Sequence, residues 1–159
     1  MLPAMDAPSA PAFDRLVPAA QDYASRPVAS AFNWTECVAP DATGEWYLVA
    51  FRSVLRASAS EARLLEFDDR AFEEASGAPG FVHYLKGPID ERRQCLSFCL
   101  WDSRAHARAA AGRPAHLEAT GIAHAMYERY ALEFYRVRKR HGSPSLEFEP
   151  YDRPHREAA

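Results

Sequence analysis

At 159 residues the chain has the length of one ordinary domain. Hydrophobic residues make up 48% and charged residues 26%, as in a typical globular protein, and the formal net charge is −3. Because general nucleic-acid binders carry a strong positive excess, this balance argues against that class. No apolar run approaches the about 20 residues of a membrane span, and the beginning of the chain lacks the basic start and apolar core of a secretory signal. We therefore expect a cytoplasmic protein that binds neither nucleic acid nor membrane.

Residues 1–40 are rich in Pro and Ala and predict an N-terminal arm. We expect its beginning to be disordered, because repeated Pro and Ala provide few side chains that can form a core. Further along, residues 14–23 predict a short helix, and the alternation around Phe32 and Trp34 predicts an extended segment that packs on the main domain. The turn-forming run 40–44, Pro-Asp-Ala-Thr-Gly, marks the boundary of that domain.

Residues 45–55, EWYLVAFRSVL, predict the first strand of the main domain. Apolar side chains alternate onto both faces of this strand, so we expect both faces to be covered. The run 58–61, Ser-Ala-Ser-Glu, resembles a capping box that opens a helix. This helix presents an apolar stripe at helical spacing. The stripe consists of Leu64, Leu65, Phe72 and Ala75.

The rest of the main domain alternates between strands and helices. Its predicted elements are strands at 81–86 and 94–101, helices at 104–111 and 115–130, and a strand at 132–138. A short loop joins the first two of these strands into a hairpin, and Asp102 or Ser103 can cap the helix that follows. Residues 141–159 predict a C-terminal extension, with an edge strand at 146–149 and a polar tail.

The order of these elements over residues 44–140 is β-α-β-β-α-β, which predicts a ferredoxin-like α+β fold with an antiparallel sheet. In this fold the helices cover one face of the sheet. The other face carries aromatic and aliphatic residues, and leaving it in water would expose a large apolar patch. A second copy stacked sheet to sheet would cover this patch, so we expect a homodimer through the sheet face.

The three cysteines, Cys37, Cys95 and Cys99, are an odd number, which argues against a disulfide framework. Cys95 and Cys99 lie four residues apart in a predicted strand, and therefore roughly 13 Å apart, too far for a bridge. Neither a CxxC motif nor a Cys/His zinc spacing occurs. We expect free, buried thiols and no metal site.

The order of elements and three sequence runs resemble the dimeric α+β barrel superfamily, in particular its antibiotic-biosynthesis-monooxygenase-like group. The runs are GFVHYLKG at 80–87, LSFCLWDSRAHARAA at 96–110 and PAH at 114–116. Many members of this group have a Trp-x-Ser before the second helix and a His further along. Trp101, Ser103 and His116 fit this pattern.

The resemblance implies a homodimeric barrel whose members include cofactor-independent monooxygenases acting on aromatic or polyketide-like substrates. The group also contains haem-degrading enzymes, which use an Asn on the first strand, and residues 45–55 contain none. We therefore expect no cofactor, and a small aromatic molecule as the ligand.

Two histidines are candidate catalytic bases. His116 follows Pro114 at the first turn of a predicted helix, where the positive end of the helix disfavours the imidazolium form. A neutral imidazole suits a general base, and a plain role at the helix start is the alternative. His83 lies in the middle of a strand and is either a pocket base or a hydrogen-bonded core residue.

Four further residues are candidate substrate contacts, namely Trp101, His106, Tyr84 and Arg52. Trp101 ends an apolar strand and either packs in the core or forms a pocket wall that stacks on a flat substrate. Arg52 stands in an otherwise apolar strand, so if it is buried it needs a partner such as an Asp, and anchoring a substrate carboxylate is its second possible role. Tyr84 points to the face opposite His83, and His106 lies on the helix after Trp101.

No phosphate loop, nucleophile elbow or dinucleotide fingerprint occurs in the sequence. Two classes of function remain: a small-molecule enzyme that resembles the cofactor-independent monooxygenases, and a non-catalytic ligand-binding or stress-related homodimer. The enzyme requires that at least two of the candidate side chains converge on one cavity. These candidates are His83, Trp101, His106 and His116.

Overall fold

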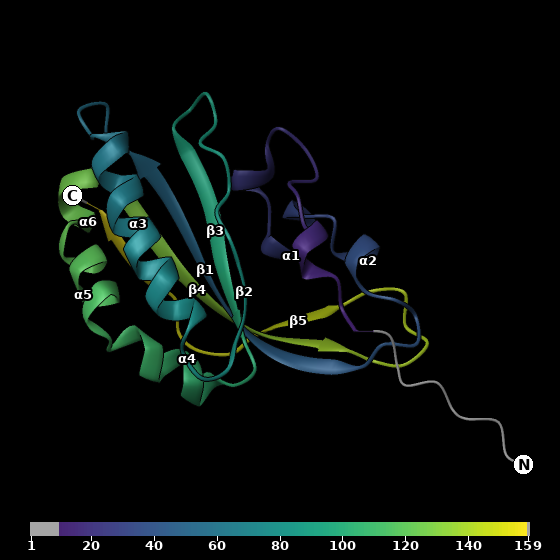
Figure 1. The fold of residues 1–159 in the computed structure, drawn as a ribbon. Coiled ribbons are helices and arrows are strands. Elements are labelled where there is room, and N and C mark those ends of the chain that lie inside the picture. Colours follow the sequence, from purple (N-terminus) through teal and green to yellow (C-terminus); the bar gives the residue numbers. More distant parts are fainter. Residues whose placement is uncertain (1–9, 159) are drawn as a thin grey trace, which may run out of the picture.

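The structure, a computed structural model, describes residues 10–158 (Figure 1). The disorder expected at the beginning of the chain falls largely on residues outside this range. An antiparallel sheet forms the middle layer, in the order β2-β3-β1-β4-β5, and β6 also pairs with β4. The strands are β1 (Gly44–Leu55), β2 (Phe81–Leu85), β3 (Gln94–Trp101), β4 (Tyr127–Lys139), β5 (Glu147–Pro150) and β6 (His155–Ala158).

Two different layers lie on the two faces of this sheet (Figure 1). One face carries the helices α3 (Glu61–Ser76), α4 (Arg104–Ala111), α5 (Pro114–Gly121) and α6 (Ala123–Met126). The other face carries the N-terminal arm, with 3₁₀ helices η1 (Phe13–Arg15) and η2 (Tyr23–Ser25) and short helices α1 (Val28–Ala31) and α2 (Trp34–Cys37). The central order β4-β1-β3-β2, with helices between β1 and β2 and between β3 and β4, is that of the ferredoxin-like fold. The predicted α+β class is confirmed.

Local sequence signals fix the starts of the two main helices. The Ser60 hydroxyl accepts a hydrogen bond from the Arg63 backbone N–H at 3.2 Å and caps α3. Ser103 caps α4 in the same way, through the His106 N–H at 3.2 Å. Ser103 is one of the two predicted caps of α4, whereas α3 begins two residues later than a capping box at 58–61 predicts, with Ser60 as its cap.

The sheet face opposite the helices is covered by the chain's own arm. Phe32 and Trp34 pack against Phe98 of β3, with ring centroids 5.0 and 5.1 Å apart. The Trp34 indole N–H donates to the Val28 carbonyl at 2.9 Å, which satisfies its one polar atom. The sheet side chains beneath the arm are almost fully buried, namely Leu48, Ala50, Leu96, Phe98, Leu100 and Val137.

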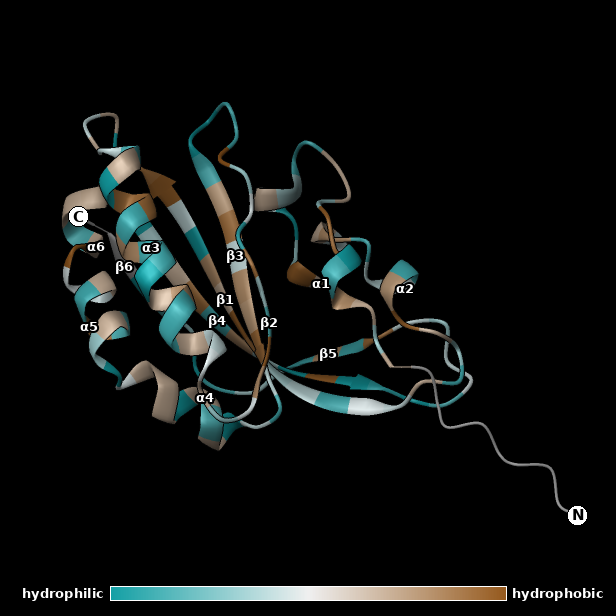
Figure 2. Ribbon diagram, in the orientation of Figure 1, coloured by the Kyte–Doolittle hydropathy of each residue, from teal (hydrophilic) through white to brown (hydrophobic). Residues whose placement is uncertain are grey.

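The homodimer was expected because this sheet face would otherwise be open to water, and the arm removes that reason. The sequence predicts an apolar face left open to water, whereas in the structure residues 13–38 close it. The strongest apolar colour in Figure 2 lies along the strands and parts of the arm, and the outer surface of α3 is largely hydrophilic. No second copy is needed to bury this face.

Four predicted elements differ from the structure. The segment around Phe32 and Trp34 packs on the sheet as expected, but it is not extended, because Trp34 begins the helix α2. Residues 14–23 form no continuous helix, since only two 3₁₀ turns occur there. The helix predicted at 115–130 ends at Gly121, and after the single turn of α6 the chain enters β4 at Tyr127. The strand starts early because β1 is long and pairs with β4 as far as Leu55 opposite Tyr127. The polar tail forms β6, while the expected edge strand is present as β5.

Candidate functional site

A cavity of about 840 Å³ lies between the sheet and the helical layer. The residues that line it come from β1, β3 and β4 on one side and from α3, α4 and α5 on the other. Most are apolar or aromatic, including Val49, Phe51, Leu64, Phe67, Phe72, Trp101, Tyr127, Leu132 and Phe134. A cavity of this size and lining suits a drug-sized organic ligand.

The cavity exists because the helical layer does not pack down onto the sheet. Neither α3 nor α5 contains a fully buried residue. Phe72 is 44% exposed although its stripe faces the sheet, and Leu65, predicted to share that stripe, is 47% exposed. Apolar surface left in water forgoes about 25 cal/mol per Å² of stabilisation. A ligand in the cavity would recover part of this energy.

Trp101 forms one wall of the cavity. It ends β3, is 4% exposed, and meets Phe81 edge to face with ring centroids 5.6 Å apart. Since only 4% of Trp101 is exposed, its neighbours hold the indole in place and it contributes a rigid aromatic edge to the cavity wall.

His116 also lines the cavity, at the start of α5. Glu74 of α3 holds this helix start, since the carboxylate accepts hydrogen bonds from the backbone N–H groups of Ala115 at 3.1 Å and His116 at 3.4 Å. Desolvation lowers the pKa of His116, and a hydrogen bond with the Ala111 backbone opposes this shift in part. The imidazole is therefore neutral near pH 7 and able to accept a proton.

A polar cluster of Asp68, Tyr84 and Lys86 reaches the cavity from α3 and the β2 edge. The Tyr84 hydroxyl donates to both Asp68 oxygens at 3.0 and 3.1 Å, and the Lys86 ammonium lies 3.0 Å from Asp68 Oδ2. Burial raises the pKa of Tyr84 far above its ordinary value, so this hydroxyl remains a donor. Tyr84 thus lies where a substrate contact is expected. Asp68 was not among the candidate residues of the sequence, because its partners are distant in the chain.

A second polar group stands at another part of the lining and was not predicted. Arg104 of α4 makes two 2.8 Å hydrogen bonds to the Asp152 carboxylate, which also accepts a hydrogen bond from the Tyr47 hydroxyl. These bonds lower the pKa of Asp152 to about 2, and the Arg104 bond is the largest cause. Tyr47 and Asp152 both line the cavity. The C-terminal extension gave no sequence signal for this contact.

Three sequence candidates do not reach the cavity. A register shift between Phe81 and His83 turns His83 to the opposite face, 6.5 Å from the ring of Phe13. His106 pairs instead with Asp102, its Nδ1 lying 2.6 Å from Oδ1.

Arg52 likewise lies on the arm side of the sheet. Its Nε lies 2.5 Å from Glu133 Oε2, and its guanidinium donates to the Ala24 carbonyl at 2.9 Å. The predicted Asp partner is therefore wrong: the partner is a Glu on the neighbouring strand. The pair ties the sheet to the arm.

All three cysteines are free thiols, as predicted, but only Cys37 is buried, and the half-buried Cys95 and Cys99 line the cavity. Burial raises the pKa of Cys99 to about 12, which keeps it protonated and unreactive. Within residues 10–158 no group of three or more His, Cys, Asp or Glu side chains could hold a metal ion. Over the same residues no helix is long and apolar enough to cross a membrane.

The sequence profile of the PB2B2.08-like family matches residues 2–150. The chain belongs to this family. A search of the curated proteins found no match.

Several solved structures share the fold at low identity. Protein SO0527 from Shewanella oneidensis is 12% identical, with a TM-score of 0.54 over 62% of this chain and 98% of its own. SnoaB, a cofactor-independent oxygenase from Streptomyces nogalater, is 18% identical, with a TM-score of 0.46 over 61% and 94%. A dimeric ferredoxin-like protein of unknown function from Thermobifida fusca is 12% identical, with a TM-score of 0.48 over 57% and 90%. At 12% identity, the match to protein SO0527 shows a shared fold and nothing further.

Proposed function

We propose that this protein is a small-molecule enzyme that oxidises an aromatic substrate with dioxygen and without a cofactor. The observation that carries this proposal is that Trp101 and His116 line the same largely apolar cavity. Two of the four candidate side chains therefore converge, which is the arrangement that the enzyme requires. The resemblance of the fold to the monooxygenase-like group agrees with this assignment.

The cavity supplies what such a reaction needs from a protein. An electron-rich phenol lies flat against Trp101, and the neutral imidazole of His116 takes the phenolic proton. The phenolate then reacts with dioxygen: one oxygen atom replaces a ring hydrogen, the second leaves as water, and the substrate becomes a quinone. The substrate supplies the electrons, so the protein contributes orientation and proton transfer.

Oxygen uptake tests the proposal, with a panel of naphthols, hydroquinones and anthrones as substrates. We expect one of them to be turned over, and His116→Gln to lower the turnover by about 10²–10⁴-fold, the usual size of general-base help. His141→Gln, on an exposed histidine outside the cavity, is the matched control and should leave turnover unchanged.

The non-catalytic alternative gives a different result in the same experiment. It is favoured by the Asp68–Tyr84–Lys86 cluster, whose groups are already paired with one another and need no reacting partner. In that case panel compounds bind, as measured by isothermal titration calorimetry, but no oxygen is consumed.

A variant that fills the cavity separates specific from non-specific binding. Ala71 lines the cavity from α3, and Ala62 lies nine residues earlier, on the opposite side of the helix. We expect Ala71→Trp to abolish binding and Ala62→Trp to preserve it. Equal binding by both variants would show that the ligand lies elsewhere.

The sequence predicts a homodimer through the sheet face, whereas the arm that covers this face in the structure favours a monomer. The arm occupies that face, so pairing through it requires residues 13–38 to move away from the sheet. The mass of the intact chain in solution tests this.

A further inference from the structure

The C-terminal edge of the sheet is interrupted beside the cavity. Both β5 and β6 pair antiparallel with β4, and the pairing stops between Pro150, opposite Tyr135, and His155, opposite Leu132. Residues 151–154 thus face only two residues of β4, which is a bulge. A bulge turns side chains out of the regular alternation. Here it brings Asp152 and its neighbour Arg153 to the cavity lining.

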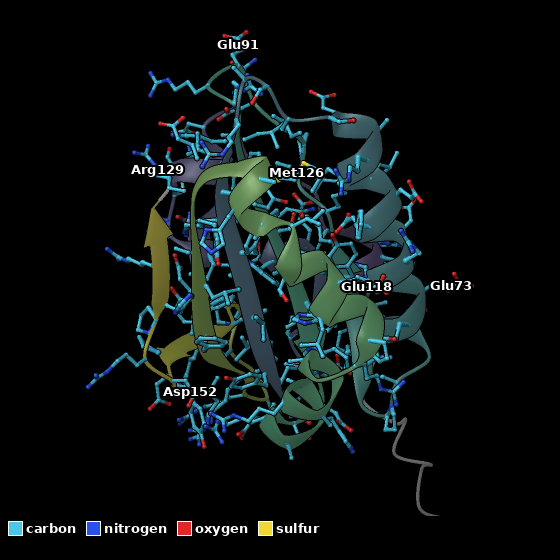
Figure 3. All side chains as sticks on the ribbon, turned by 90° about the vertical axis from the view of Figure 1, so that its left-hand side faces the viewer. Glu73, Glu91, Glu118, Met126, Arg129 and Asp152 are labelled. Atoms are coloured by element: carbon cyan, nitrogen blue, oxygen red, sulfur yellow. The ribbon has the colours of Figure 1, made fainter. Side chains whose placement is uncertain are left out.

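Three arginines and one carboxylate meet at this bulge. Arg104 and Arg108 stand one turn apart on α4, so they project from the same face of the helix. Arg108 and Arg153 line the same cavity as Asp152. Figure 3 shows nitrogen-bearing side chains gathered around the labelled Asp152 at this end of the sheet.

The single carboxylate is already engaged. Asp152 receives two hydrogen bonds from Arg104 and one from Tyr47. Arg108 and Arg153 both line the cavity. Among residues 10–156, whose side chains the structure describes, no carboxylate forms an ion pair with either arginine. This group of residues, which we name the arginine end, therefore carries an excess of positive charge beside an apolar cavity.

We propose that the arginine end binds an anionic group of the ligand, with Arg108 and Arg153 as its contacts. The ligand is then amphipathic: a flat apolar body lies along Trp101 and Phe134, and a carboxylate or a similar oxyanion is bound at the bulge. Arginine suits this role because its guanidinium donates paired hydrogen bonds to planar oxyanions. This inference rests on the cavity of the proposed function and specifies the class of substrate.

Two fluorescent probes with the same aromatic body test the charge preference. 1-Anilinonaphthalene-8-sulfonate carries an anionic group, and N-phenyl-1-naphthylamine does not. We expect the anionic probe to bind about tenfold more tightly, the effect of one or two charge-assisted hydrogen bonds. In the double variant Arg108→Gln/Arg153→Gln this preference should disappear, while the neutral probe binds within about twofold of its original affinity. Arg92→Gln, on the exposed hairpin tip, is the control and should change neither affinity.

The outcomes distinguish this inference from the function on which it rests. Equal affinity for both probes, unaffected by the double variant, overturns the arginine end and leaves the cavity in place. Binding of neither probe overturns the cavity as a ligand site as well. A preference for the anionic probe that survives in Ala71→Trp also contradicts the inference, because the probe then lies outside the cavity.

Discussion

His116 is the residue on which the proposed chemistry depends, and its titration gives a testable pH dependence. Desolvation lowers its pKa below the ordinary 6.5, so it is a free base at neutral pH and loses that capacity only on acidification. We expect kcat/KM to be flat near pH 7 and to fall below pH 6.5. In His116→Gln this acid limb should disappear from the small remaining activity. If kcat/KM of the variant still falls below pH 6.5, the titrating group is not His116.

The same shift has a consequence for stability. A histidine whose pKa is lower in the folded protein binds fewer protons there than in the unfolded chain, so stability falls as the pH drops through 6.5. His83, whose pKa is lowered by burial against the arm, acts in the same direction. We expect the midpoint of urea unfolding to decrease between pH 7 and pH 5. His83→Gln should make this decrease in the urea midpoint smaller. A larger decrease in the variant would show that the pKa of His83 is not lowered in the folded protein.

Single-residue predictions from the sequence succeeded where a side chain acts within its own element. Ser60 and Ser103 cap helices because capping needs only the next three residues. Regular alternation along the strand would place His83 on the same face as Phe81, but a register shift between these two residues moves His83 to the other face. A β-bulge depends on the pairing with the neighbouring strand, which the sequence of one strand does not specify.

At the scale of elements, the strands and main helices were predictable because their apolar periodicity is strong. The structure of the arm could not be predicted, because a Pro/Ala-rich segment without regular periodicity can either cover a surface or remain unfolded. Its few large side chains decide the outcome. Trp34 is 3% exposed and contacts aromatic rings from three parts of the chain. These rings belong to Phe13, Phe32, Phe98 and Phe148.

We expect Trp34→Ala to lower the free energy of unfolding by about 3–5 kcal/mol, the usual cost of removing a buried Trp. Val17→Ala, in the same arm but 54% exposed, should change it by less than about 0.5 kcal/mol. Urea unfolding followed by circular dichroism measures both. Equal, small effects would show that the arm does not contribute to the core.

At the scale of the whole molecule, the two faces of the sheet are used differently. The arm fills one face with a dense aromatic core, while the helices on the other face leave a cavity. The arm layer thus contributes most of the core that stabilises the fold, and the helical layer leaves the space in which a ligand can bind. This division explains why the candidate site was only half predictable: Trp101 and His116 lie near one another in the sequence, whereas Asp152 reaches the cavity only through the folding of the C-terminal edge.

The arm also determines how the molecule can associate. With residues 13–38 in place, the sheet face offers no apolar surface to a second copy, so we expect the intact chain to sediment as a monomer at micromolar concentration. Deleting residues 1–38 uncovers Leu48, Phe98 and Leu100, and an apolar patch of this kind drives association. The truncated chain should therefore sediment as a dimer or aggregate. If the intact chain is instead a dimer whose arm is readily cleaved by protease, the two copies meet through the sheet after all, and the arm is displaced in solution.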